Sequence, residues 1–184
     1  MPFSMSGRTV GLISLILFIL TIPAGNWVVM NVGTVCPPDS PCLIPVWPGI
    51  MSPSAVLFAG LALILRDAVQ SLLGKRWTLV AIAAGAALSG ILSEPAIILG
   101  STCAFLFSEL ADFAVYTPLR ERHLTLAIVL SGLVGSLVDS VIFLSLAFGS
   151  LDFIVGQVIG KFWMSLIAGA MIIMWRSTRR AQAA

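Results

Sequence analysis

The sequence predicts an all-α integral membrane protein, built as a bundle of six transmembrane helices. Of its 184 residues, 59% are hydrophobic and only 10% are charged, whereas a soluble domain has roughly 25% charged residues. The mean hydropathy is +1.07, so the chain has too little polar surface to face water on all sides. Backbone groups in lipid must be hydrogen-bonded within their own segment, and long apolar runs therefore predict helices.

Apolar runs long enough to cross a bilayer occur six times. A transmembrane helix needs about 20 apolar residues. The runs lie at about 9–30, 53–73, 77–93, 98–118, 124–148 and 153–175, and we expect them to make residues 1–184 a single integral membrane domain. We expect the first run to be a span and not a cleaved signal peptide, because it is long and no A-x-A-like site follows it.

The basic residues predict the orientation of these spans. They occur at the N-terminus, at alternate connections and after the last span: Arg8, Lys75, Arg76, Arg120, Arg122, Arg176, Arg179 and Arg180. The other connections, 31–52, 94–97 and 149–152, contain no Lys or Arg. Cytoplasmic loops carry an excess of Lys and Arg, so both termini are predicted to be cytoplasmic, in a multi-pass protein of the bacterial inner membrane.

The longest connection, 31–52, is rich in proline, which favours extended backbone over helix. It also contains Cys36 and Cys42. The predicted orientation places this loop outside the cytoplasmic membrane, where disulfides form and persist. We therefore expect a loop-closing disulfide, the alternative being two free thiols.

Polar and ionisable residues inside the predicted spans are few. Ionisable groups at membrane depth are costly unless paired or hydrated, and they are functional candidates for that reason. They are Asn26 in the first span, Arg66, Asp67 and Gln70 in the second, Glu109 and Asp112 in the fourth, Asp139 in the fifth and Lys161 in the sixth.

Helical spacing places most of these groups on common faces. Residues three and four positions apart share one face of a helix. Such faces are formed by Phe105, Glu109, Asp112 and Tyr116; by Gly132, Ser136, Asp139 and Phe143; and by Gln157, Lys161, Met164 and Ala168. We expect the first, fourth, fifth and sixth spans to enclose a polar cavity open to the outside, with the second and third spans as support.

The alternative for these groups is a set of buried ion pairs that only fixes helix packing. Arg66 and Asp67 fit that interpretation as well as they fit a second polar layer below the cavity. Glu109, Asp139 and Lys161 fit a binding site better, because two acids and one base at similar depth cost more than helix register requires.

Several other function classes find no support in the sequence. No G-x-S-x-G, H-E-x-x-H or phosphate-binding glycine loop occurs, and the single histidine, His123, lies in a basic connection. A metal site, a cofactor and an enzymatic activity are therefore not expected. The net charge of +2 is too small to indicate nucleic-acid binding.

Short segments in a fixed order resemble the queuosine precursor transporter family, also called the vitamin uptake transporter (VUT) family. They run from about residue 20 to about residue 172. They are Gly25-Asn26-Trp27-Val28-Val29, Arg66-Asp67-Ala68-Val69 before Gly74, Ala104-Phe105, Ser108-Glu109, Asp112-Phe113, Tyr116, Gly135, Asp139-Ser140, Phe143 and Gly160-Lys161.

The resemblance implies import of a 7-deazaguanine such as preQ0 or preQ1, used for tRNA modification. It also implies six helices around a central site, as in the substrate-binding components of energy-coupling-factor transporters. A carboxylate can accept the two adjacent donors of such a base, and we expect Glu109 or Asp139 to do so. The rest of the expected substrate-binding set is Asn26, Trp27, Phe105, Asp112, Phe143 and Lys161, which supply hydrogen bonds or an aromatic slot.

Three arrangements fit the sequence. The first is a transporter that works by alternating exposure of the cavity, the second a substrate-binding subunit with a separate energising module, and the third a structural membrane subunit that transports nothing. The expected partners are the deazaguanine base and the lipid bilayer, with a homo-oligomer or an energising module left open. The energy source is open as well.

Overall fold

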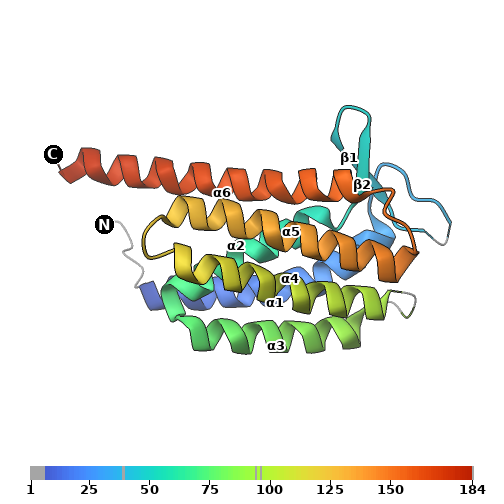
Figure 1. Ribbon diagram of the computed structural model, residues 1–184, viewed down its shortest axis with the longest axis horizontal. Helices are drawn as coiled ribbons and strands as arrows, with labels where there is room; N and C mark the ends of the chain where they lie inside the picture. The colour runs from blue at the N-terminus through green and yellow to red at the C-terminus, as the bar shows by residue number, and fades with distance from the viewer. Residues whose placement is uncertain (1–6, 39, 94, 96, 184) are drawn as a thin grey trace.

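The computed structural model describes residues 7–38, 40–93, 95 and 97–183, which form six helices and one β-hairpin (Figure 1). In chain order the elements are α1 (Gly7–Asn31), β1 (Leu43–Trp47), β2 (Ile50–Pro53), α2 (Val56–Leu73), α3 (Lys75–Leu92), α4 (Ile98–Leu119), α5 (Leu124–Phe148) and α6 (Ile154–Ala183). Each apolar run of the sequence corresponds to one of these helices.

The outer surface of the bundle is apolar and much of its interior is polar. Large side chains such as Ile16, Val80 and Ile91 are 58%, 61% and 75% exposed. Five of the described helices, α1 to α5, are long and apolar enough to cross a membrane, and α6 adds a shorter apolar stretch, Ile154–Ile167. An apolar exterior around a polar interior is the arrangement that lipid favours, so the fold is that of a multi-pass membrane protein.

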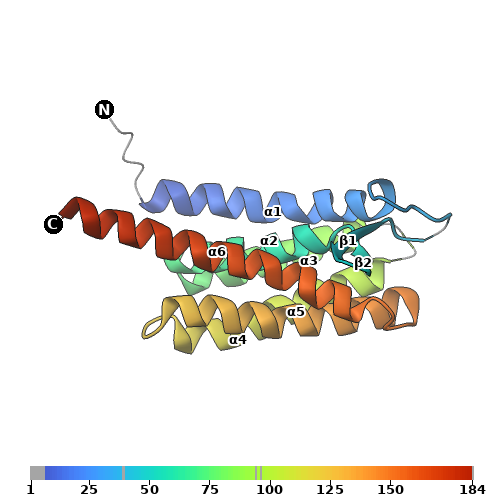
Figure 2. The same ribbon diagram turned by 90° about the horizontal axis from the view of Figure 1, so that it is seen from above.

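The helices run side by side along the long axis of the molecule, as Figures 1 and 2 show from two directions. The start of α1 and the end of α6 lie at one end, together with the α2–α3 and α4–α5 connections. This end carries the basic residues that flank the helices, among them Arg8, Lys75 and Arg122. The β-hairpin and the other connections lie at the opposite end.

The helix α2 is the centre of the bundle, contrary to the expected supporting role of the second span. Within the described residues it packs against α1, α3, α4, α5 and α6. Its residues Arg66, Asp67 and Gln70 are buried. The sequence shows these polar groups directly. It does not show which helices surround α2, because the spatial arrangement of the helices has no local signal in the sequence.

Two connections depend on glycine. Gly74 alone joins α2 to α3 and has a φ of 91°, and Gly149 ends α5 in the left-handed region with a φ of 64°. Residues that carry a side chain rarely adopt a positive φ, so glycine suits both positions. The one-residue connection at Gly74 keeps α2 and α3 close together at the basic end of the bundle.

The β-hairpin was not predicted from the sequence. Strands β1 and β2 pair antiparallel, with Leu43 opposite Pro53, and Pro48 and Gly49 connect them. The many prolines predicted extended backbone but no pairing. The hairpin packs against the first turns of α6, where Trp47 stacks on Trp163 with 5.9 Å between ring centroids.

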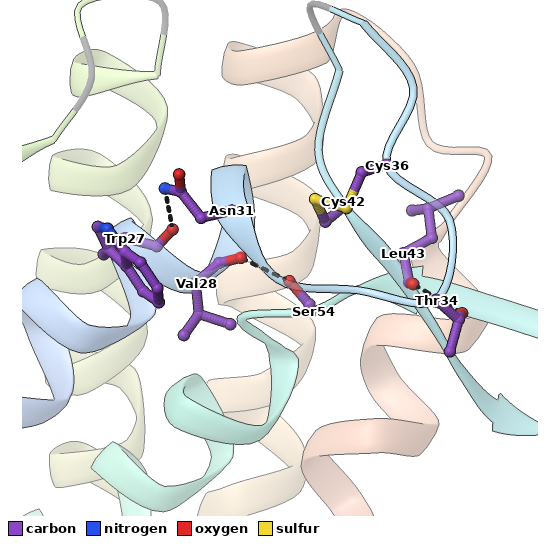
Figure 3. The surroundings of a disulfide bond; sticks show 8 residues. All are labelled: Trp27, Val28, Asn31, Thr34, Cys36, Cys42, Leu43 and Ser54. Atoms are coloured by element: carbon purple, nitrogen blue, oxygen red, sulfur yellow. Dashed lines mark hydrogen bonds between the residues drawn. A yellow bond between two sulfur atoms is a disulfide. The ribbon is translucent and has the colours of Figure 1, made fainter.

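A disulfide between Cys36 and Cys42 closes the loop before the hairpin (Figure 3). Hydrogen bonds attach this loop to the end of α1. The amide of Cys42 donates to the carbonyl of Val29 over 2.8 Å. The hydroxyl of Ser54 donates to the carbonyl of Val28 over 3.0 Å, as Figure 3 shows. The remaining cysteine, Cys103 on α4, is free.

Reduction of this disulfide is expected to loosen the loop without unfolding the helices. Closing a loop with a sequence separation of 6 restricts the open chain by about 2 kcal/mol in the chain-entropy model. Amide hydrogen exchange should therefore become faster for residues 34–36 and 42–43 in the Cys36→Ala/Cys42→Ala variant and stay unchanged in α3. Equal exchange in the two proteins would contradict the expectation.

Candidate ligand-binding cavity

A cavity of about 90 Å³ lies in the half of the bundle nearest the hairpin. All six helices contribute to its wall. The polar wall residues are Thr21, Asn26, Ser89, Ser101, Asp139 and Gln157, and the aromatic ones are Phe58, Phe105 and Phe143. The amide nitrogen of Asn26 is buried and has no hydrogen-bond partner. A largely apolar wall with a few polar groups is typical of small-molecule sites.

A second cavity of about 30 Å³ lies next to the first, one to two helical turns further from the hairpin. Ala59, Ala62, Phe105 and Asp139 line both cavities. The polar residues that line only the smaller one are Ser108, Glu109 and Lys161. Asp139 therefore lies at the junction of the two cavities.

Lys161 is fully buried and is held by three acceptors on α5 and α6. Its ammonium forms an ion pair with the Oδ2 atom of Asp139 and donates to the Oε1 atom of Gln157. It also donates to the hydroxyl of Ser140 over 2.9 Å. An ammonium has three N–H donors, so these contacts use all of them. Lys161 thus supports the cavity wall and has no donor left for a ligand.

A second ion cluster surrounds Arg66 on α2, still further from the hairpin. The guanidinium contacts three carboxylates: Asp67 over 2.9 Å, Glu109 over 3.1 Å, and Asp112. All four side chains are nearly inaccessible to solvent. Arginine suits this position because its planar fork carries five donors. The cluster joins α2 to α4 across the middle of the bundle.

Further polar groups extend the Arg66 cluster towards the basic end. Gln70 accepts a hydrogen bond from Arg66 over 3.3 Å and donates to Thr117 over 2.8 Å. The guanidinium of Arg66 lies 5.6 Å from the centre of the Tyr116 ring, within the range of a cation–π interaction. The guanidinium of Arg120, just after α4, donates to the backbone carbonyl of Gln70 over 2.7 Å. These contacts join α2 to the C-terminal end of α4.

The ring of Phe105 lines both cavities and lies against Gly85 of α3. A Cβ atom at Gly85 would lie 2.6 Å from the ring, which is closer than such atoms approach. On its other side the ring contacts Phe18 of α1, with 5.8 Å between centroids. Because Gly85 has no side chain, α3 can approach α4 closely enough to pack directly against the Phe105 ring.

The Gly85→Ala variant is expected to lower the free energy of unfolding by about 1 kcal/mol or more, because overpacking outweighs the gain in helix propensity. Gly90→Ala is a matched control on α3, since its Cβ atom would find its nearest neighbour at 3.4 Å. Melting temperatures in detergent compare the two. A lower melting temperature for Gly90→Ala than for Gly85→Ala would contradict this account of the packing.

The structure brings together most of the residues singled out in the sequence. Asn26, Phe105, Asp139 and Phe143 line the larger cavity, and Phe105, Glu109, Asp139 and Lys161 line the smaller one. Arg66 and Asp67 lie further from the hairpin than both cavities, in the ion cluster around Arg66.

Two of the expected site residues lie elsewhere. The side chain of Trp27 is 60% exposed on the outer surface of α1, because it follows Asn26 directly and so points about a quarter turn away from it. Asp112 is one turn beyond Glu109 and pairs with Arg66, outside the residues that line the two cavities.

Other wall residues were missed by the sequence analysis. Gln157 shares a helical face with Lys161, and a polar pair four residues apart inside a span is the signal that could have identified it as a site residue. Ser89 of α3, Ala55 just before α2, and Ala59 and Ala62 of α2 also line the larger cavity. Alanine gives no chemical signal for a binding site. Among the described residues, no group of His, Cys, Asp and Glu side chains is placed to hold a metal ion.

Comparison with known proteins identifies the family. Residues 54–175, more than half of the chain, match the model of a family described as "Putative vitamin uptake transporter". No curated protein and no solved structure matches the chain. The matched region extends from the end of the hairpin into α6 and includes both ion clusters and most of the cavity wall. The chain therefore belongs to the vitamin uptake transporter family.

Proposed function

We propose that this transporter imports a queuosine precursor, a 7-deazaguanine such as preQ0 or preQ1, across the bacterial cytoplasmic membrane. Family membership makes the chain an uptake transporter of the vitamin type, and the cavity is its candidate substrate site. A deazaguanine is flat and carries a guanine-like edge, in which one carbonyl oxygen lies next to two N–H donors. A suitable site needs apolar walls, a carboxylate and a hydrogen-bond donor.

The observation that carries the proposal is the position of Asp139. Its Oδ2 atom is held by Lys161, while its Oδ1 atom has no hydrogen-bond partner among the described residues. The side chain is 18% exposed and lines the cavity. Each carboxylate oxygen can accept two hydrogen bonds. The free Oδ1 atom and the remaining lone pair of Oδ2 can therefore accept the two N–H donors of the guanine-like edge in charge-assisted hydrogen bonds. Phe105 and Phe143 supply aromatic surface for the ring.

Glu109 is less suited to reading this edge. It lines only the smaller cavity and its Oε2 atom contacts Arg66. We propose that Glu109 closes the bottom of the site and that Asp139 makes the direct contact. Of the two acids considered from the sequence, Asp139 is therefore the one that we assign to the base.

The distribution of charge supports an orientation with six spans and both termini in the cytoplasm. The basic residues that flank α1, α3 and α4 lie at one end of the bundle, as the positive-inside tendency requires. The hairpin, the disulfide and the larger cavity lie towards the other end. With this orientation the larger cavity lies closer to the outer surface of the membrane than to the cytoplasmic surface, and an importer first meets its substrate at the outer surface.

A binding screen tests the proposal. The purified protein in detergent is titrated with preQ0, preQ1, queuine and guanine, with unrelated vitamins as controls, while its melting temperature is followed. We expect stabilisation by at least one deazaguanine and none by the control vitamins, because a ligand that binds only the folded state raises its stability. If a control vitamin stabilises the protein and no deazaguanine does, the proposed substrate is wrong and that vitamin takes its place.

Uptake by vesicles that contain only this chain then distinguishes a complete transporter from a substrate-binding subunit. Accumulation of labelled base inside the vesicles is expected for a transporter. Binding without accumulation would indicate a subunit that depends on an energising module, as in energy-coupling-factor transporters.

A further inference from the structure

The contacts of Lys161 determine which way the Gln157 amide points. The ammonium group carries only donors, so the neighbouring amide must present its oxygen to it, and the Oε1 atom of Gln157 does so. The reverse orientation would place an NH2 group against the ammonium. The hydroxyl of Ser140 lies 2.7 Å from the carbonyl of Ser136 and 3.5 Å from the same Oε1 atom, and it can donate its proton to either, so it too favours an oxygen of Gln157 at this place.

The Nε2 atom of Gln157 is consequently turned away from Lys161. It has no hydrogen-bond partner among the described residues, yet it is not one of their buried unpaired atoms. Although the residue as a whole is only 3% exposed, its side chain lines the larger cavity. The amide therefore offers its two N–H donors to that cavity.

We propose that Gln157 is a specificity-determining residue that donates a hydrogen bond to the ring carbonyl of the bound base, and that Lys161 is the positioning residue that directs this donor. The inference rests on the proposed function, since it assumes a base with a guanine-like edge. It gives Gln157 a hydrogen-bonding role for which the sequence indicated other polar residues, Asn26 and Lys161 among them.

The pairing of Gln157 with Asp139 favours this assignment. Both side chains contact the same ammonium, so an acceptor on α5 and a donor on α6 are held next to each other. The guanine-like edge has the complementary order, with N–H donors beside a carbonyl oxygen. Asn26 also lines the cavity, but it comes from α1 and shares no contact with Asp139 in the described structure.

The test combines a change in the protein with a change in the ligand. Wild type and Gln157→Met are titrated with the deazaguanine that binds best and with its analogue in which sulfur replaces the carbonyl oxygen. Sulfur is a weaker acceptor and methionine is not a donor. We expect wild type to bind the oxygen compound roughly tenfold more tightly than the sulfur compound, and Gln157→Met to lose most of this preference.

Two further variants separate the donor from its support. Gln157→Glu keeps an acceptor for Lys161 but places an oxygen opposite the carbonyl, so its affinity for the oxygen compound should fall by about tenfold or more. Lys161→Met leaves Gln157 in place but frees its amide to rotate, and the preference for oxygen over sulfur should shrink. Asn31→Asp is the matched amide-to-acid control, because Asn31 is exposed at the end of α1 and bonds only the carbonyl of Trp27.

The outcomes distinguish this inference from the proposed function. If wild type binds deazaguanines and Gln157→Met keeps the full preference for oxygen, the role of Gln157 is wrong and the proposed function stands. If no deazaguanine binds wild type, the proposed function itself fails. Should the Gln157 variants not fold, the wild-type titrations still decide, since equal affinity for the oxygen and sulfur compounds would overturn the assigned donor.

Discussion

The Arg66→Met variant is expected to lose about 3–5 kcal/mol of stability, enough to prevent accumulation of folded protein. Arg66 is the cation in contact with three buried carboxylates, those of Asp67, Glu109 and Asp112. Methionine matches much of the volume but leaves these acids without a counter-charge in the interior of the bundle. Size-exclusion profiles and melting temperatures in detergent provide the measurement.

The same charge argument predicts how the loss can be reversed. Adding Glu109→Gln and Asp112→Asn to Arg66→Met removes most of the unpaired charge, so the triple variant should be more stable than the single one. Arg122→Met, in the exposed α4–α5 connection, is the matched control and should behave like wild type. If Arg66→Met melts at the wild-type temperature, the cluster does not hold α2 and α4 together.

The Asp139→Asn variant is expected to bind the deazaguanine at least roughly 100-fold more weakly than wild type. Hydrogen bonds to a charged group contribute about 1.5–3 kcal/mol each, and an asparagine replaces one of the two carboxylate oxygens by a donor. The variant also removes the partner of the buried Lys161 ammonium, so some loss of stability without ligand is expected as well. Titration calorimetry measures the affinity, and the melting temperature without ligand measures the stability.

Asp152→Asn supplies the control for Asp139→Asn, since Asp152 is exposed in the connection between α5 and α6. Its affinity for the base should equal that of wild type. Undiminished binding by folded Asp139→Asn would remove Asp139 from the site and would direct attention to Glu109, the other acid that lines a cavity.

The helices could be predicted from the sequence because the signal for them is local. A run of about 20 apolar residues can satisfy its backbone in lipid only as a helix, and the expected spans fall within α1 to α6 or differ from them by a few residues at their ends. The shared face of Phe105 and Glu109 likewise followed from helical spacing, and both line the smaller cavity.

What the sequence left open depends on the rotation and order of the helices. Trp27 and Asn26 are neighbours in the chain, but only one of them lines the cavity. The central position of α2 and the three acids around Arg66 depend on contacts between residues far apart in the sequence. Arg66 and Asp112, for example, are 46 positions apart, and α2 also packs on α6. The hairpin was missed because its prolines mask the usual alternation of strand residues.

The hairpin has a mechanical consequence for the two ends of the chain. Helices α1 and α6 do not form an extensive packing interface with each other in the described part of the chain. The segment between them is nevertheless hydrogen-bonded to the end of α1 through Cys42 and rests on the first turns of α6 through Trp47. This segment therefore links the end of α1 to the start of α6, and the Cys36–Cys42 disulfide shortens the part of it next to α1. Separation of α1 from α6 at this end of the bundle would therefore have to stretch or break these contacts.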